Sequence, residues 1–135
     1  MVIDSSALIV LLGGELETAQ FVAAIAAASS RVVSASTYLE AAIVVSARWG
    51  AQGQERFDRL LADLAIDILP FTYDQAVVAA IAYRQYGRGS GHAAGLNFGD
   101  CFSYALAKLR DEPLLFKGDD FSHTDLRAAI TSEGY

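Results

Sequence analysis

Short apolar runs alternate along the chain with longer segments in which apolar residues recur at helical spacing. Four short runs are predicted as strands, and they span residues 1–4, 31–36, 67–71 and 113–118. Longer segments are predicted as helices, and they span residues 5–14, 15–30, 37–50, 54–66, 72–87 and 100–111. Residues 119–130 are expected to form a loop followed by an edge strand. Strands that alternate with helices are typical of an α/β sandwich with a mostly parallel sheet.

The chain length of 135 residues suits one compact domain, so residues 1–135 are expected to form a single domain. Counted with its eleven Gly and without its six Tyr, the apolar fraction is about 57%, above the usual ~45–50%. This surplus has two explanations, an apolar surface that a partner covers or a crowded core. Composition alone does not decide between them.

The net charge of −6 differs from the basic charge of proteins that hold nucleic acid by charge alone. A polyanionic substrate would therefore need local cations, either a few Arg side chains or metal ions. One Cys and two His exclude a disulfide framework and a conventional zinc site. The sequence lacks a run long enough to span a membrane and a signal-like start, so we expect a cytoplasmic protein without membrane contact.

Acidic residues recur where predicted strands end and helices begin. Asp4 ends the first strand, Glu40 follows the second, and Asp100 begins the helix after a glycine-rich loop. The pair Asp119 and Asp120 follows the last core strand. Ligands of open α/β sheets bind outside the carboxyl ends of the strands, so these side chains are expected at one edge. Clustered carboxylates repel one another, and a hard divalent cation such as Mg²⁺ resolves that repulsion.

Each acidic residue also has a purely structural explanation. Thr37 and Glu40 have the spacing of a capping box, and Asp100 stands three residues after Asn97 at a helix start. Asp4 is suited to cap the helix that follows it, and the last acidic pair suits a turn. The spacing alone leaves both explanations open for each residue.

Cations for a substrate are predicted around the glycine-rich loop, residues 87–99. Arg84, Arg88 and His92 are the predicted substrate-binding residues, because glycine-rich backbone beside Arg approaches phosphates closely. A solvated loop without a binding role is the alternative.

Four segments together resemble the PIN-domain ribonucleases, specifically the VapC toxins of bacterial toxin–antitoxin modules. They are VIDSSAL, ASTYLEAAIV, LNFGDCFSYALAK and PLLFKGDDFSHTDL, in this order along nearly the whole chain. The resemblance implies a three-layer α/β/α sandwich and cleavage of single-stranded RNA, often a tRNA loop, with Mg²⁺ or Mn²⁺. It also implies a homodimer that a VapB antitoxin neutralises.

Carried over by position, the resemblance makes Asp4 and Asp100 the main metal ligands, joined by Glu40 directly or through water. Ser6 would orient a carboxylate or a water, and Asp119 would be the fourth acidic group. The fourth motif departs from the family, because many PIN domains have more residues between the acidic residue and the Asp before Phe. We prefer Asp119 to Asp120 as the group that faces the metal.

With these residues the expected reaction is hydrolysis of a phosphodiester by a water that the metal activates. Because the ribose 2′-OH is not needed as a nucleophile, the products should carry a 5′-phosphate and a 3′-hydroxyl. Three other functions compete with this interpretation: an aspartyl phosphatase, a non-catalytic binding or phospho-receiver-like module, and a PIN fold without activity. The phosphatase would need Asp where Ser6 stands, and the receiver would need an Asp at the end of a middle strand.

Overall fold

The computed structural model describes residues 1–131 and contains a four-stranded, entirely parallel sheet in the order β3-β2-β1-β4. The strands are β1 (Val2–Ile3), β2 (Val32–Ser34), β3 (Asp67–Leu69) and β4 (Leu114–Leu115). The predicted edge strand within residues 119–130 is reduced to one parallel bridge between Leu114 and Ala128. The last four residues of the predicted single domain lie outside the described part.

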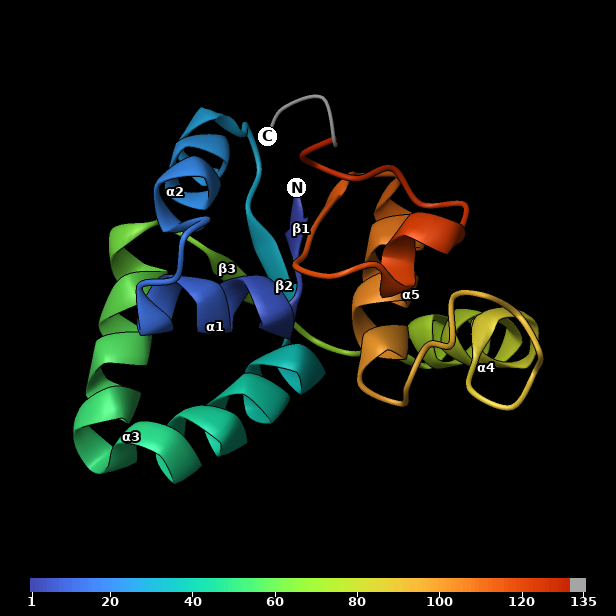
Figure 1. Cartoon of the computed structure of the whole chain (residues 1–135), viewed down its shortest axis with the longest axis horizontal. Helices are drawn as coiled ribbons and strands as arrows, with labels where there is room; N and C mark the ends of the chain where they lie inside the picture. Colours follow the sequence, from blue (N-terminus) through green and yellow to red (C-terminus); the bar gives the residue numbers. More distant parts are fainter. Residues whose placement is uncertain (132–135) are drawn as a thin grey trace.

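Helices cover both faces of this sheet, so the predicted three-layer α/β/α architecture is confirmed (Figure 1). One layer holds α1 (Ser5–Gly13), α2 (Thr18–Ala27) and α3 (Ala35–Asp63), and the other holds α4 (Tyr73–Tyr86) and α5 (Asp100–Arg110). A short 3-10 helix, η1, spans Asp120–His123. Of the helices within residues 1–131, none is both long and apolar enough to cross a membrane.

Two apolar clusters show why the sheet is covered on both sides. Neighbouring strand residues point to opposite faces, since side chains alternate along a strand. Those that pack with α1, α2 and α3 are Ile3, Val33 and Leu115. Those that pack with α4 and α5 are Val2, Val32 and Leu114. Strands β1, β2 and β4 are therefore apolar on both faces, as expected for a parallel sheet between helical layers.

Helix α3 consists of two helical arms that meet at a kink at Gly50, as the two helices predicted here require. Gly50 has φ 66° and ψ −157°, a combination that is essentially restricted to glycine. The helical segments before and after it correspond to the predicted helices 37–50 and 54–66. Figure 1 shows the bend, which directs the first arm of α3 below α1 and the second arm past it.

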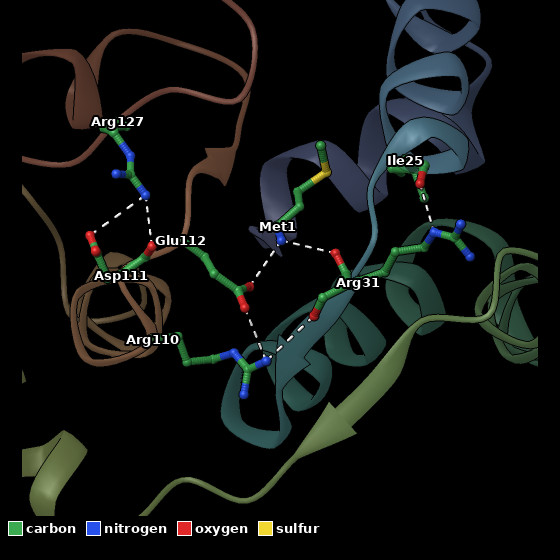
Figure 2. A network of polar contacts seen from close by, with 8 residues as sticks. Met1, Ile25, Arg31, Arg110, Asp111, Glu112 and Arg127 are labelled. Carbon is green, nitrogen blue, oxygen red and sulfur yellow. Dashed lines mark hydrogen bonds and ion pairs between the residues drawn. The ribbon is translucent and has the colours of Figure 1, made fainter.

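A network of polar contacts fixes the start of β1 at the centre of the sheet (Figure 2). The amino group of Met1 donates to the backbone oxygen of Ser30 and to Glu112 Oε2, at 2.9 Å each. Arg110 Nη2 pairs with Glu112 Oε1 at 3.0 Å. These contacts join the segments that lead into β2 and β4 to β1. The carboxyl ends of all three strands are thereby aligned at the opposite edge of the sheet.

Candidate active site at the carboxyl edge of the sheet

Asp4 lies at the carboxyl end of β1 and caps α1, and it is only 2% exposed. Its Oδ2 accepts hydrogen bonds from the backbone N–H of Ser6 at 3.1 Å and from Ser6 Oγ at 2.7 Å. Its Oδ1 accepts from Ser103 Oγ, on α5, at 2.6 Å. The carboxylate is thus held through both oxygens, by its own turn and by a distant helix.

Glu40 projects from the first turns of α3 toward the start of α1 and α5. Ser5 Oγ donates to Glu40 Oε1 at 2.8 Å. A Cβ added at Gly99 would overlap Glu40 Oε2, so the carboxylate lies against the start of α5. The capping box between Thr37 and Glu40 is not formed, because Ser34 caps α3 instead.

Asp100 begins α5 and forms reciprocal hydrogen bonds with Asn97. The Asn97 N–H donates to Asp100 Oδ2 at 3.0 Å, and the Asp100 N–H donates to Asn97 Oδ1 at 2.8 Å. Burial raises the pKa of Asp100 to about 6, and the negative charges of Asp4, Asp120 and Glu40 act in the same direction. Burial also raises the pKa of Glu40, with a contribution from Asp4. The carboxylates from four segments therefore act on one another electrostatically.

The acidic pair after β4 is divided between two places. Asp120 begins η1 and is the member of the pair whose charge raises the pKa of Asp100. Asp119 lines a different cavity, of about 550 Å³, together with Glu17 and Phe121. The structure thus brings Asp120 toward the other carboxylates, whereas Asp119 was preferred from the sequence.

A cleft of about 500 Å³ opens beside Glu40, and two cations line it, Arg48 and Lys117. The backbone N–H of Lys117 donates to Ser6 Oγ at 3.0 Å, which joins the end of β4 to the Asp4 turn. The position of Arg48 was missed from the sequence, although a signal was present. Glu40 and Arg48 are eight residues apart on α3 and share one face of the helix.

The predicted substrate-binding residues of the glycine-rich loop lie elsewhere. The lining of the cleft beside Glu40 does not include Arg84, Arg88 or His92. Arg84 is in the last turn of α4, and the His92 ring packs on Tyr86 with centroids 4.8 Å apart. Figure 1 shows the loop of residues 87–99 beside α4, on the side of α5 away from α1.

The donor set suits a hard divalent cation. In residues 1–131 no three His, Cys, Asp or Glu side chains are grouped so as to hold one ion. Mg²⁺, however, keeps several waters and is commonly bound through one or two carboxylates, so Asp4 and Asp100 suffice as protein ligands. Burial is the main cause of the raised pKa values of Asp100 and Glu40, and repulsion from neighbouring carboxylates adds to it. Bound cation charge would relieve this repulsion.

Cys101 beside Asp100 is not suited to be a nucleophile. Its Sγ is 3.4 Å from the backbone oxygen of Asn97, and the side chain is buried. Burial raises the pKa of this thiol to about 11, with the charge of Asp100 adding to the effect. The thiolate needed for attack is therefore scarce at neutral pH.

This parallel sheet, with acidic side chains at its carboxyl edge, matches the PIN-domain family over residues 1–126. Ribonuclease VapC30 of Mycobacterium tuberculosis is 50% identical over 126 residues, which cover 93% of this chain and 95% of that protein. Ribonuclease VapC42 of the same species is 45% identical over 131 residues, which cover 97% of this chain and 100% of that protein. The chain therefore belongs to the PIN-domain family, and within it to the VapC ribonucleases.

Solved structures share the fold at low sequence identity. VapC20 of Mycobacterium tuberculosis, described as a toxin that cleaves the sarcin–ricin loop, has a TM-score of 0.72 at 15% identity. That similarity covers 93% of this chain and 95% of VapC20. VapBC2 of Rickettsia felis, bound to a promoter DNA fragment, has a TM-score of 0.76 at 13% identity. That similarity covers 94% of this chain and 95% of the Rickettsia chain. These likenesses support the three-layer fold.

Proposed function

We propose that this VapC ribonuclease is a divalent-metal-dependent endoribonuclease and the toxin of a toxin–antitoxin pair. The observation that carries the proposal is the convergence of Asp4, Glu40, Asp100 and Asp120 at one edge of the sheet. Its relatives at 45–50% identity are named as VapC ribonucleases. RNA is the substrate class, and a cytoplasmic location is part of the proposal.

Asp4 and Asp100 are the residues that would hold Mg²⁺ or Mn²⁺. When bound, such an ion lowers the pKa of a coordinated water and neutralises charge on the phosphate under attack. The chain itself orients the ligands: Ser6 holds Oδ2 of Asp4, and Asn97 holds Oδ2 of Asp100. Ser5 Oγ donates to Glu40 Oε1 and fixes the orientation of this carboxylate, whose pKa burial raises above its usual value.

We assign the fourth acidic position to Asp120 in place of Asp119, because only Asp120 interacts with Asp100. Phosphate binding is assigned first to Arg48 and Lys117, which line the cleft beside Glu40. Arg84, Arg88 and His92 remain candidates for contacts with more distant parts of the RNA. Their exposure leaves them available for that role.

The central experiment incubates antitoxin-free protein with RNA, with and without EDTA. Cleavage should require the metal and should be lost in Asp4→Asn and Asp100→Asn. The products should carry a 5′-phosphate and a 3′-hydroxyl. Cleavage that survives both substitutions would reject the assigned site, and a 2′,3′-cyclic phosphate would reject the hydrolytic route. Binding without cleavage would favour a non-catalytic module.

An antitoxin and a second copy of the chain are the proposed protein partners. Leu39 and Ile43 of α3 are 60% and 62% exposed and flank Glu40 along the chain. An antitoxin bound there would also cover the cleft beside Glu40. Blocking this cleft would explain how the antitoxin neutralises the toxin. A separate stripe on α4, formed by Tyr73, Val77 and Ile81, is assigned to the homodimer. Two structural neighbours that are toxin–antitoxin complexes support the first assignment.

A further inference from the structure

A row of buried polar groups links three elements at the carboxyl edge of the sheet. Thr37 Oγ1 of α3 lies 3.3 Å from Ser103 Oγ of α5, and Ser103 Oγ lies 2.6 Å from Asp4 Oδ1. Thr37, Ser103 and Asp4 are 0%, 1% and 2% exposed. All other donors to the Asp4 carboxylate among the described contacts come from Ser6, two residues away.

The direction of these hydrogen bonds follows from the number of protons. An ionised carboxylate only accepts, so the hydroxyl of Ser103 must donate its one proton to Asp4. Ser103 Oγ then acts toward Thr37 only as an acceptor, so the hydroxyl of Thr37 must donate. Thr37 therefore orients Ser103, and Ser103 orients Asp4.

We infer that Ser103 is a positioning residue that holds Asp4 in the orientation needed to bind the divalent ion, and that Thr37 supports it. The inference rests on the proposed metal-dependent function. A carboxylate held through Oδ2 alone remains free to turn about its Cβ–Cγ bond. The bond from Ser103 to Oδ1 removes that freedom, because it comes from a different element and engages the other oxygen.

The same bonds determine which part of Asp4 faces an ion. Oδ2 already accepts two hydrogen bonds from Ser6, which fill its acceptor positions. Oδ1 accepts only the bond from Ser103 among the described contacts, so one acceptor position remains on that atom. Loss of hydrogen bonds that orient metal ligands typically weakens metal affinity about 10–100-fold.

The test measures Mn²⁺ binding to the antitoxin-free protein by titration calorimetry, without RNA. Ser103→Ala should raise the Kd for Mn²⁺ about tenfold and lower kcat for RNA cleavage. Thr37→Val should raise the Kd by a smaller factor, about threefold, since Ser103 still reaches Asp4. Thr37→Ser keeps the hydroxyl and should restore affinity to the wild-type value.

Ser34→Ala is the matched control for a general loss of stability. Ser34 is 1% exposed and caps α3, and no hydrogen bond from its hydroxyl to the Asp4 carboxylate is among the described contacts. This variant should melt at a lower temperature and bind Mn²⁺ like the wild type. Equal loss of affinity in Ser34→Ala and Ser103→Ala would overturn the positioning role. Should Ser103→Ala not fold, the comparison of Thr37→Val with Thr37→Ser decides the matter by itself.

Failure of the inference differs from failure of the proposed function. Wild-type affinity in Ser103→Ala and Thr37→Val, with metal-dependent cleavage intact, would overturn the inference alone. A wild-type protein that neither binds Mn²⁺ nor needs a metal for cleavage would overturn both.

Discussion

At the residue scale, the acidic side chains stabilise helix starts and form the candidate site at the same time. Asp4 caps α1 through the N–H of Ser6, and Asp100 forms the reciprocal bonds with Asn97 that were considered as a structural alternative. The structural and functional explanations of these two residues are therefore compatible. The unfavourable part is the burial of the Asp100 carboxylate, which raises its pKa, and repulsion from the neighbouring carboxylates adds to that effect.

The raised pKa of Asp100 predicts how Asp100→Asn changes the free energy of unfolding at different pH values. The pKa of Asp100 is raised from 3.8 to about 6 on folding, so its ionised form destabilises the metal-free protein at neutral pH. Asp100→Asn should increase the free energy of unfolding at pH 7.5 by up to about 2 kcal/mol. The gain should shrink as pH falls from 6 to 4, where the wild-type carboxyl becomes protonated.

Chemical denaturation of both proteins in EDTA at several pH values measures this difference. Asp63→Asn on α3 is a control, because Asp63 does not contribute to the shift at Asp100. An Asp100→Asn protein that is less stable than the wild type at pH 7.5 would contradict the prediction.

The two neighbouring acidic residues after β4 should differ in their effect on cleavage. Asp120→Asn should lower kcat at least about tenfold, because Asp120 interacts with Asp100. Asp119→Asn should change kcat less than about twofold, because Asp119 lines the cavity beside Glu17 and Phe121. Single-turnover cleavage of a labelled RNA by both variants compares them directly. The opposite order would restore Asp119 as the fourth acidic group.

At the element scale, the bend of α3 determines which residues of that helix reach the site. The first arm carries Glu40 and Arg48 beside the cleft, and the second arm carries Phe57 and Leu61 into the core. The bend depends on Gly50, whose backbone angles other residues rarely adopt. The sequence indicated the break, but the angle between the arms depends on packing against α1.

Replacing this glycine should destabilise the fold. Gly50→Ala should lower the free energy of unfolding by about 1–3 kcal/mol, because its φ of 66° with ψ of −157° strains a residue with a Cβ. Gly13→Ala is the matched control: Gly13 is helical, and its added Cβ would meet atoms only at ordinary distances of 3.7 Å or more. That variant should be unchanged or more stable by about 0.5–1 kcal/mol. In thermal melts the melting temperature should therefore fall for Gly50→Ala and stay the same or rise for Gly13→Ala.

The exposed stripe on α4 should mediate self-association. Val77 and Ile81 are 42% and 50% exposed and lie four residues apart on one face of α4. Ile81→Asp should convert the proposed homodimer to a monomer in light scattering, because a charge would be buried in the contact. Ile43→Asp on α3 should leave the dimer intact and weaken antitoxin binding. Dimers that persist in Ile81→Asp would place the contact elsewhere.

At the scale of the whole molecule, folding assembles one electrostatic site from four separate segments. The segments meet because β1, β2 and β4 are parallel neighbours, with helices α1, α3 and α5 starting at the same edge. The folded chain therefore concentrates like charges that are far apart in the unfolded chain. A bound cation should stabilise the folded state for this reason.

Mn²⁺ should raise the melting temperature of the antitoxin-free protein. At a free concentration of one hundred times its Kd, the ion should add about 2.7 kcal/mol to the free energy of unfolding. This gain corresponds to a rise in melting temperature of roughly 8 °C. Asp4→Asn should lose most of the shift, since it removes a proposed ligand. Scanning fluorimetry with and without EDTA provides the measurement. Equal shifts in the wild type and in Asp4→Asn would indicate binding at another place.

The sequence by itself determined the main elements and their order, and it singled out three acidic groups of the proposed site. Alternation of apolar strands with helices is a local property, and Asp4, Glu40 and Asp100 follow from their positions at element boundaries. The tertiary structure favours Asp120 over Asp119 as the proposed fourth acidic group, because adjacent residues in a turn point in directions set by the backbone around them. It also brought Ser103 to Asp4 across 99 positions of sequence and Arg48 to the cleft. These contacts depend on how helices pack on the sheet, and local sequence patterns carry no information about distances between elements.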